Sequence, residues 1–264
     1  MGATLVRLLA AAPGLELVGG TARVGSAVLG QRLGAGRVVD SLERALTEGR
    51  AEVVVDFTGP AASLLHAQTC AVKGVPLVIG STGFDAVQRA ELAQVAQRIP
   101  LVVAPNMSVG VNLVFQTAAH LARVLGAGFD VEIVETHHRM KKDAPSGTAL
   151  KLAEEVARAT GRSEANYCLA REGQTGVRPS AEIGIQSLRG GDVVGEHTVL
   201  FFGEGERVEL THRATSRDPF AAGALRAAAW LIGRAPGLYD MQDVLGLRAS
   251  EESPAPGGGL SGSA

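Results

Sequence analysis

Two adjacent histidines and three cationic side chains stand together near the middle of the 264-residue sequence. The cluster consists of His137, His138, Arg139, Lys141 and Lys142. It lies in the stretch 134–150, VETHHRMKKDAPSGTAL, where a Pro-Ser-Gly-Thr turn leads into a helical pattern. Free backbone N–H groups and the dipole at a helix N-terminus attract anions. The residue types therefore predict an anion-binding loop whose histidines suit acid–base chemistry near neutral pH.

A metal site and a solvated basic loop are the two alternatives to an anion-binding loop. A metal site is disfavoured because no cysteine or carboxylate cluster at ligand spacing accompanies the histidines, and neighbouring cations repel a divalent ion. A merely solvated basic loop does not account for the turn, in which Ser146 is placed as a helix N-cap and Gly147 and Thr148 open the helix. The remaining histidines lack such a context and are expected to be structural. They are His66, His120, His197 and His212.

Small and polar residues also follow two predicted strands, at the edge where open parallel sheets bind ligands. These positions are Gly80, Ser81, Thr82 and Gly83 after one strand, and Ala104, Pro105, Asn106 and Met107 at the end of the next. The glycines let a ligand approach the backbone, and the Asn106 amide can hydrogen-bond it. Arg23, after an earlier strand, is placed where a cation can meet a ribose 2′-phosphate. Each feature alone is ordinary turn chemistry; together they favour a nucleotide site.

Apolar strands alternate with helical patterns up to residue 108, which is typical of a parallel sheet covered on both faces. The predicted strands there are 15–20, 53–58, 77–79 and 101–104, and the predicted helices are 3–12, 60–72 and 85–97. A long apolar helix at 109–125 marks a change. Strands with alternating polarity follow at 129–135, 181–189, 196–202 and 207–215, with a hairpin turn at 203–206. They predict a second domain with a mixed or antiparallel sheet, and the helix 219–234 is expected to return to the first.

The overall composition narrows the class of protein. Acidic and basic residues number 27 and 25, so no global charge favours nucleic acid or an anionic membrane. Two cysteines, Cys70 and Cys168, fit a reducing cytoplasm. No signal pattern or membrane-spanning run is evident, and a cytoplasmic protein is expected. The tail 250–264, SEESPAPGGGLSGSA, is expected to be disordered.

The basic loop resembles the signature of the 4-hydroxy-tetrahydrodipicolinate reductase family of lysine and diaminopimelate biosynthesis. The resemblance is carried by HHR at 137–139, Lys141 and DAPSGTA at 143–149. It extends along nearly the whole chain, up to about Ala249. Further matching segments are VVVDFT at 53–58, GSTGF at 80–84, APNMSVGVN at 104–112, GDVVGEHTV at 191–199, THRATSRDPFAAGALRAAAWL at 211–231 and GLYDMQDVLGL at 237–247.

The resemblance implies an α/β fold with a Rossmann-like parallel-sheet domain and an α+β mixed-sheet domain for substrate binding and tetramerisation. The dinucleotide-binding domain would consist of residues 1–108 and 218–249. Residues 109–217 would form the domain that binds the substrate and joins the subunits of a homotetramer. It also implies an NADPH- or NADH-dependent reductase acting on a cyclic dicarboxylate. His137 and Lys141 would supply protons, and His138, Gly147 and Thr148 would hold a carboxylate. Gly80, Ser81 and Thr82, together with Ala104, Pro105, Asn106 and Met107, would contact the cofactor.

Two departures from the family pattern matter. The family begins with a strand and a Gly-x-x-Gly-x-Met-Gly loop, of which only Met1 and Gly2 correspond here, so we expect the natural chain to start upstream. Many members carry an acidic residue where this chain has Ala22; with Arg23 retained, NADPH is favoured over NADH. Two alternatives stay open. One is a dicarboxylate-binding or oligomerisation module without turnover, and the other is a different nicotinamide enzyme, such as an amino-acid dehydrogenase, which the intact signature disfavours.

Overall fold

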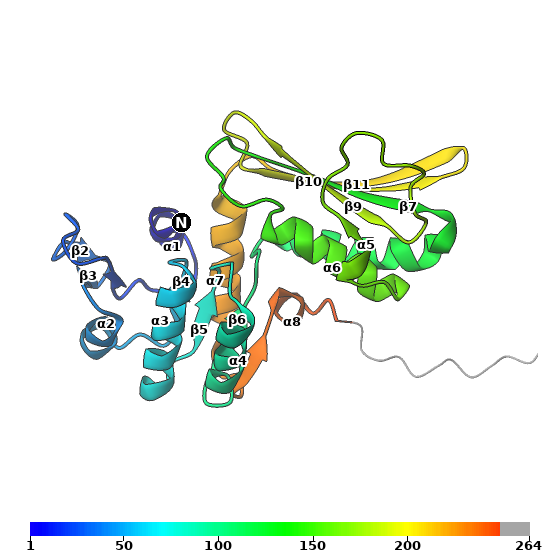
Figure 1. The fold of residues 1–264 in the computed structure, drawn as a ribbon. Helices are drawn as coiled ribbons and strands as arrows, with labels where there is room; N and C mark the ends of the chain where they lie inside the picture. Colours follow the sequence, from blue (N-terminus) through cyan, green and yellow to red (C-terminus); the bar gives the residue numbers. More distant parts are fainter. Residues whose placement is uncertain (249–264) are drawn as a thin grey trace, which may run out of the picture.

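The computed structural model describes residues 1–248, and the predicted disordered tail at 250–264 lies outside them. Two main sheets, each with its own helices, lie side by side in Figure 1. One is the parallel sheet expected from the first part of the sequence, and the other is the mixed sheet expected after Val109. This is the predicted fold class.

The parallel sheet has the strand order β12-β6-β5-β4. Its strands are β4 (Val54–Asp56), β5 (Leu77–Ile79), β6 (Pro100–Val103) and β12 (Gly237–Tyr239). Neighbouring side chains of a strand point to opposite faces, so Leu77 and Ile79 pack towards helices α3 (Pro60–Lys73) and α4 (Ala86–Val95). Val78 packs on the other face, against α1 (Gly2–Leu9) and α7 (Asp218–Leu231). Both faces are therefore covered, which explains the continuous apolar runs of these strands.

A separate small sheet precedes the parallel one, and here the prediction was largely wrong. Its strands are β1 (Gly20–Thr21), β2 (Arg32–Leu33) and β3 (Gly36–Val39), in the order β1-β3-β2, followed by helix α2 (Leu42–Gly49). The expected strand 15–20 contributes only its last residue, and β2, β3 and α2 were not anticipated. A Cβ at Gly34 would lie 1.8 Å from the Leu17 carbonyl oxygen, so this backbone approach depends on glycine rather than on an apolar pattern. No ladder joins β1 to β4 within residues 1–248.

The mixed sheet has the strand order β11-β10-β7-β9-β8. Its strands are β7 (Asp130–His137), β8 (Tyr167–Cys168), β9 (Ile183–Arg189), β10 (Gly195–Gly203) and β11 (Glu206–Ala214). Strand β10 runs antiparallel to β7 and β11, whereas β9 runs parallel to β7 and β8. Helices α5 (Val109–Leu125) and α6 (Gly147–Thr160) cover one face and bury the alternating apolar residues of β7, β9 and β10 (Figure 1).

The C-terminal elements return to the parallel sheet. Helix α7 packs closely under the loop after β6, because a Cβ at Gly223 would lie 1.8 Å from the Met107 carbonyl oxygen. Strand β12 then pairs with β6, and helix α8 (Met241–Leu245) follows it. The Gln242 side-chain amide donates a hydrogen bond to the Asn112 carbonyl oxygen of α5 at 3.1 Å. This bond ties the mixed-sheet helices to the elements around the parallel sheet.

Candidate active site

The N-terminus of α6 is formed as the sequence predicts. Ser146 is the N-cap, and its hydroxyl accepts a hydrogen bond from the Ala149 backbone N–H at 3.2 Å. The backbone N–H groups of Gly147 and Thr148 have no acceptor among residues 1–248. Two free donors thus lie in the first turn of a 14-residue helix, where an anion-binding position is predicted.

The loops that end β5 and β6 meet this helix terminus. The Asn106 side-chain amide donates a hydrogen bond to the Thr148 hydroxyl at 3.0 Å. A Cβ placed on Gly147 would lie 3.9 Å from side-chain carbons of both Pro105 and Thr82. The structure therefore brings the predicted cofactor residues of the parallel sheet into contact with the predicted substrate residues of α6.

His137, at the end of β7, lies beside a buried carboxylate. Its Nδ1 is 2.5 Å from Oε2 of Glu135, a residue with 0% exposure. Arg189 at the end of β9 binds both oxygens of that carboxylate, at 2.9 and 2.8 Å. Burial opposes ionisation of Glu135, but the hydrogen bonds from His137 and Arg189 outweigh it and hold its pKa well below the usual range. Glu135 is thus an ionised partner for His137.

Lys141 and His138 occupy the loop between β7 and α6. The Lys141 ammonium lies 2.9 Å from each carboxylate oxygen of Asp143. The His138 backbone N–H donates to the Val193 carbonyl oxygen at 2.7 Å, which fixes this loop against the loop after β9. Burial raises the pKa of Asp143 and Lys141 lowers it, with the net result below its ordinary value. The sequence interpretation did not foresee Asp143 as the partner of Lys141.

His197, which was expected to be structural, packs directly beside the predicted acid His137. It is 4% exposed, its ring packs edge-on against His137 at 5.2 Å between centroids, and its Nε2 lies 3.2 Å from the Ser146 hydroxyl. Burial, reinforced by the charge of His137, lowers the pKa of His197 to about 3. A neutral imidazole therefore supports both the helix cap and the predicted acid. The sequence feature that could have indicated this contact is the position of His197 in the segment 195–197, GEH, on strand β10 beside β7.

The cofactor-side loops offer mainly backbone groups. The N–H groups of Ser81 and Thr82 have no acceptor among residues 1–248. Gly80 lies against the Phe57 ring, where a Cβ would come within 2.2 Å of a ring carbon. Ala104 and Met107 are buried in the core beneath α7, so their side chains are not available to a ligand. A glycine-lined edge with free donors fits the phosphates and amide of a dinucleotide.

A second polar network, which the sequence interpretation missed, supports that edge from the end of β4. Asp56 is buried and accepts hydrogen bonds from the Thr58 backbone N–H at 2.6 Å and the Thr58 hydroxyl at 2.7 Å. Its other oxygen lies 2.6 Å from His66 Nδ1. Ser63 continues the network by donating to the Ser81 hydroxyl at 2.8 Å. His66, expected to have no special context, therefore belongs to the support of the Gly80 loop.

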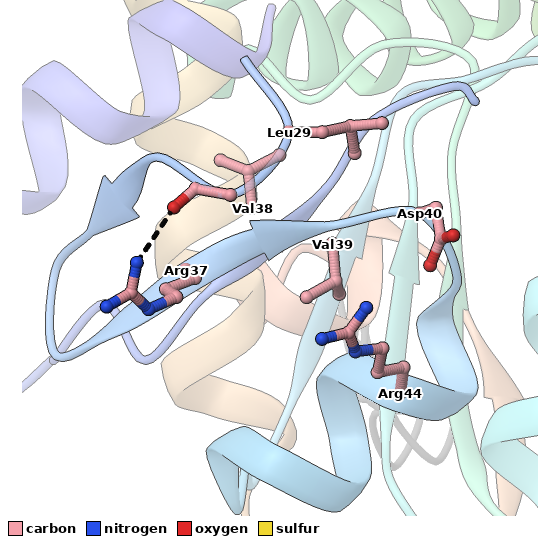
Figure 2. Close-up of a pocket in the computed structure, with 7 residues that line it drawn as sticks. Leu29, Arg37, Val38, Val39, Asp40 and Arg44 are labelled. Carbon is pink, nitrogen blue, oxygen red and sulfur yellow. Dashed lines mark hydrogen bonds between the residues drawn. The ribbon is translucent and has the colours of Figure 1, made fainter. Parts of the chain in front are cut away.

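Arg23 lies on an exposed turn directly after β1, in the small sheet. A pocket of about 110 Å³ lies in the same part of the molecule, beside β3 and the start of α2. Figure 2 shows residues that line it. Val39, Asp40 and Arg44 contribute to its walls, and Arg37 donates a hydrogen bond to the Gly30 carbonyl oxygen at 3.0 Å. Arg23 therefore lies in the small sheet and Gly80–Gly83 after a strand of the parallel sheet, and the role of Arg23 at the cofactor site stays a prediction.

Comparison with known proteins identifies the family. Residues 1–107 match the family model described as dihydrodipicolinate reductase, N-terminus, and residues 110–245 match the one described as dihydrodipicolinate reductase, C-terminus. The chain belongs to the dihydrodipicolinate reductase family. It is 62% identical to the 4-hydroxy-tetrahydrodipicolinate reductase of Myxococcus xanthus, over 94% of each chain. It is 57% identical to the enzyme of the same name from Anaeromyxobacter dehalogenans, over 95% of this chain and 96% of the relative.

Solved structures agree with this family assignment. A dipicolinate-bound dihydrodipicolinate reductase from Paenisporosarcina sp. TG-14 superposes with a TM-score of 0.71 at 28% identity, covering 92% of this chain and 94% of the other. An amine dehydrogenase from Mycobacterium smegmatis shares the fold at a TM-score of 0.56 and 12% identity, with coverage of 89% and 90%. The fold of this chain thus also occurs in a dehydrogenase of another name.

None of the helices within residues 1–248 combines the length and apolar character needed to cross a membrane. In the same residues, no group of three or more His, Cys, Asp and Glu side chains is arranged to hold a metal ion.

Proposed function

We propose that this chain catalyses the NADPH- or NADH-dependent reduction of 4-hydroxy-tetrahydrodipicolinate to tetrahydrodipicolinate, a step of lysine and diaminopimelate biosynthesis. One observation carries the proposal: the hydrogen bond from Asn106 to Thr148 joins a dinucleotide-type sheet edge to an anion-binding helix N-terminus. The paired histidines lie beside that terminus. Membership in the dihydrodipicolinate reductase family supports 4-hydroxy-tetrahydrodipicolinate as the substrate of this site.

The cofactor is proposed to lie along the carboxyl edge of the parallel sheet. The free N–H groups of Ser81 and Thr82 and the amide of Asn106 would hold it, with Gly80 and Pro105 lining its path. Ala104 and Met107 would contribute through their backbone, because their side chains are buried. When bound, the reduced nicotinamide supplies the hydride. Arg23 would meet the ribose 2′-phosphate if the turn after β1 closes over the cofactor.

The substrate is proposed to bind through its two carboxylates. The N–H groups of Gly147 and Thr148 would receive one of them, and His138 would hold it from the facing loop. Charge-assisted hydrogen bonds at a helix N-terminus bind carboxylates well and fix their orientation. The related reductase whose structure contains dipicolinate, a planar cyclic dicarboxylate, supports this substrate class.

His137 and Lys141 are proposed to supply the protons of the reaction. The substrate gains a hydride and a proton and loses its hydroxyl group as water, so a positioned acid is required. Proton transfer by such an acid typically accelerates a reaction by about 10²–10⁴. The ionised carboxylate of Glu135 accepts a hydrogen bond from His137, and the Lys141 ammonium is an additional donor held in the same loop by Asp143.

The protein is also proposed to act as a cytoplasmic homotetramer. The face of the mixed sheet turned away from α5 and α6 carries apolar side chains, among them Leu188 at 54% exposure and Phe202 at 37%. Exposed apolar side chains on a regular sheet face are typical of an interface between subunits. A tetramer in solution that dissociates in the variant Leu188→Glu would support this assembly, and a monomeric wild-type protein would contradict it.

The proposed activity is tested by following NADPH oxidation with enzymatically generated substrate. Wild-type protein is expected to turn over, and His137→Gln is expected to lower kcat by about 10²–10⁴ with little change in the dissociation constant of NADPH. The exposed hairpin variant Glu204→Gln is a matched control and is expected to retain activity. Binding of dipicolinate without any NADPH oxidation would instead favour a dicarboxylate-binding module.

A further inference from the structure

The carboxylate of Glu135 and the imidazole of His137 lie on the same face of β7. Residues two apart in a strand point the same way, and the two groups approach to 2.5 Å between Oε2 and Nδ1. Glu135 has 0% exposure, so water does not compete for its oxygens. A buried polar contact of this kind fixes the orientation of the ring.

Arg189 completes the contacts of that carboxylate. It is the residue of β9 that pairs with His137 in the parallel register, and its guanidinium binds both Glu135 oxygens, at 2.9 and 2.8 Å. The Ser146 backbone N–H also donates to Glu135 Oε1, at 3.2 Å. The hydrogen bonds from His137 and Arg189 hold the pKa of Glu135 well below its usual range despite its burial. Glu135 is therefore ionised and can only accept hydrogen bonds.

An acceptor at this position determines which nitrogen of His137 carries the proton. Nδ1 must be a donor towards Glu135, which leaves Nε2 as the nitrogen that exchanges protons. A Cβ on Gly195 would lie 3.1 Å from Nε2, so the absence of a side chain at Gly195 keeps this nitrogen clear. If His137 releases a proton from Nε2, the neutral tautomer that remains is the one that Glu135 stabilises.

Arg189 also reaches the loop that carries Lys141. Its Nη2 donates a hydrogen bond to the Asp143 carbonyl oxygen at 2.7 Å. The Asp143 carboxylate in turn lies 2.9 Å from the Lys141 ammonium. One guanidinium therefore connects the partner of His137 with the partner of Lys141, and a planar five-donor group is suited to such a role.

From these contacts we propose that Glu135 and Arg189 are positioning residues for proton transfer. They fix His137 as the Nδ1-protonated tautomer with Nε2 free for the substrate. Arg189 also ties the loop that carries Lys141 to the same carboxylate, through its hydrogen bond to the Asp143 carbonyl oxygen. The inference deepens the reductase activity proposed above and depends on it for its catalytic consequence. The arrangement of the tautomer itself does not depend on turnover.

The tautomer is tested by nitrogen NMR of histidine-labelled protein, with His137→Gln used to assign the signals. Wild-type His137 is expected to show a protonated Nδ1 in its neutral form. In Glu135→Gln the two ring nitrogens are expected to move towards averaged shifts, because a glutamine can present either its carbonyl or its amide. A wild-type ring protonated on Nε2, or an unchanged spectrum in Glu135→Gln, would overturn the proposal.

Steady-state kinetics test whether Glu135 and Arg189 affect catalysis through His137. Glu135→Gln is expected to lower kcat by about 10- to 100-fold while the KM for substrate and the NADPH dissociation constant change less than about two-fold. In a His137→Gln background, the same substitution is expected to change kcat by less than about two-fold, since residues acting as a unit are not additive. Equal losses in both backgrounds would contradict a role exercised through His137.

Two variants separate positioning from folding. Glu135→Gln leaves Arg189 without its buried partner, so the double variant E135Q/R189M, which contains neither charge, is measured alongside it. It is expected to fold and to show the same loss of kcat and of tautomer preference. Glu132 is also on β7 but pairs with Arg171 and Arg178, which lie between β8 and β9. The kcat of Glu132→Gln is expected to stay within about two-fold of wild type.

The outcomes distinguish this inference from the proposed function. An active wild-type protein whose kcat is unaffected by Glu135→Gln would leave the reductase proposal standing and remove the positioning role. An inactive wild-type protein with the expected Nδ1 tautomer would remove the proposed function and retain the structural part of the inference.

Discussion

The side-chain amide of Asn106 donates a hydrogen bond to the hydroxyl of Thr148 across 3.0 Å. The two residues are 42 positions apart: Asn106 follows strand β6 of the parallel sheet, and Thr148 opens helix α6, which covers the mixed sheet. The same Asn106 accepts a hydrogen bond from the Ser108 backbone N–H at 2.9 Å, so its side chain is held at both ends. This contact sets the spacing between the proposed hydride donor and the proposed carboxylate site.

Loss of the acceptor in this contact should affect substrate binding most. In Thr148→Val the Asn106 amide loses its partner, at a cost of about 1–3 kcal/mol, while the Thr148 N–H is retained. We expect the KM for substrate to rise by about 10-fold and the NADPH dissociation constant to change little. Steady-state kinetics and cofactor fluorescence titration measure the two quantities. Thr148→Ser, which keeps the hydroxyl, should behave like wild type, and a change confined to NADPH binding would contradict the assignment.

Asp143 should compete with the substrate for Lys141. Its carboxylate lies 2.9 Å from the ammonium, and a negative charge beside a site for a dianion repels the ligand. We expect Asp143→Asn to lower the KM for substrate by about three-fold at low salt, with a smaller effect at high salt because of screening. Substrate titrations at two ionic strengths measure the change. An increase in KM would contradict competition between the Asp143 carboxylate and the substrate.

Acid should destabilise the protein partly through His197. Its pKa is about 3 in the folded state, mainly because of burial, against an ordinary value of 6.5. Below pH 6.5 the unfolded chain binds the proton and the folded protein does not, so this contribution to stability is complete above pH 6.5 and declines down to about pH 3. Relative to His197→Gln, the wild type should lose roughly 3 kcal/mol between pH 7 and pH 4. Urea denaturation at several pH values measures this difference, and parallel curves for the two proteins would exclude it.

Arg23 should affect the choice between the two cofactors. A guanidinium that binds the ribose 2′-phosphate contributes a charge-assisted hydrogen bond of about 1.5–3 kcal/mol. We expect Arg23→Ala to weaken NADPH binding by about 10- to 100-fold and to leave NADH binding nearly unchanged. Arg32→Ala, another exposed cation of the small sheet, is the matched control. Equal losses for both cofactors would show that Arg23 does not read the phosphate.

Much of the fold follows from local patterns. The apolar strands at β4, β5 and β6 and the alternating strands at β7, β10 and β11 lie close to their predicted ranges because burial on two faces or on one leaves a readable pattern. The small sheet of β1, β2 and β3 does not follow from a local pattern. Strands β2 and β3 are short and depend on close glycine contacts with residues 17 and 18, and such contacts leave no periodicity in the sequence.

The candidate site divides in the same way. The residue types of the stretch 134–150 determined that an anion-binding, histidine-containing loop precedes a capped helix, because capping and charge are local properties. Only the tertiary structure decided which groups complete it. Arg189 meets Glu135 through the register of β9 beside β7, and His197 meets His137 through the register of β10. Likewise, Asn106 meets Thr148 only because the parallel sheet packs against α6. Contacts between residues 42 to 60 positions apart depend on how the sheets pack, which no local pattern encodes.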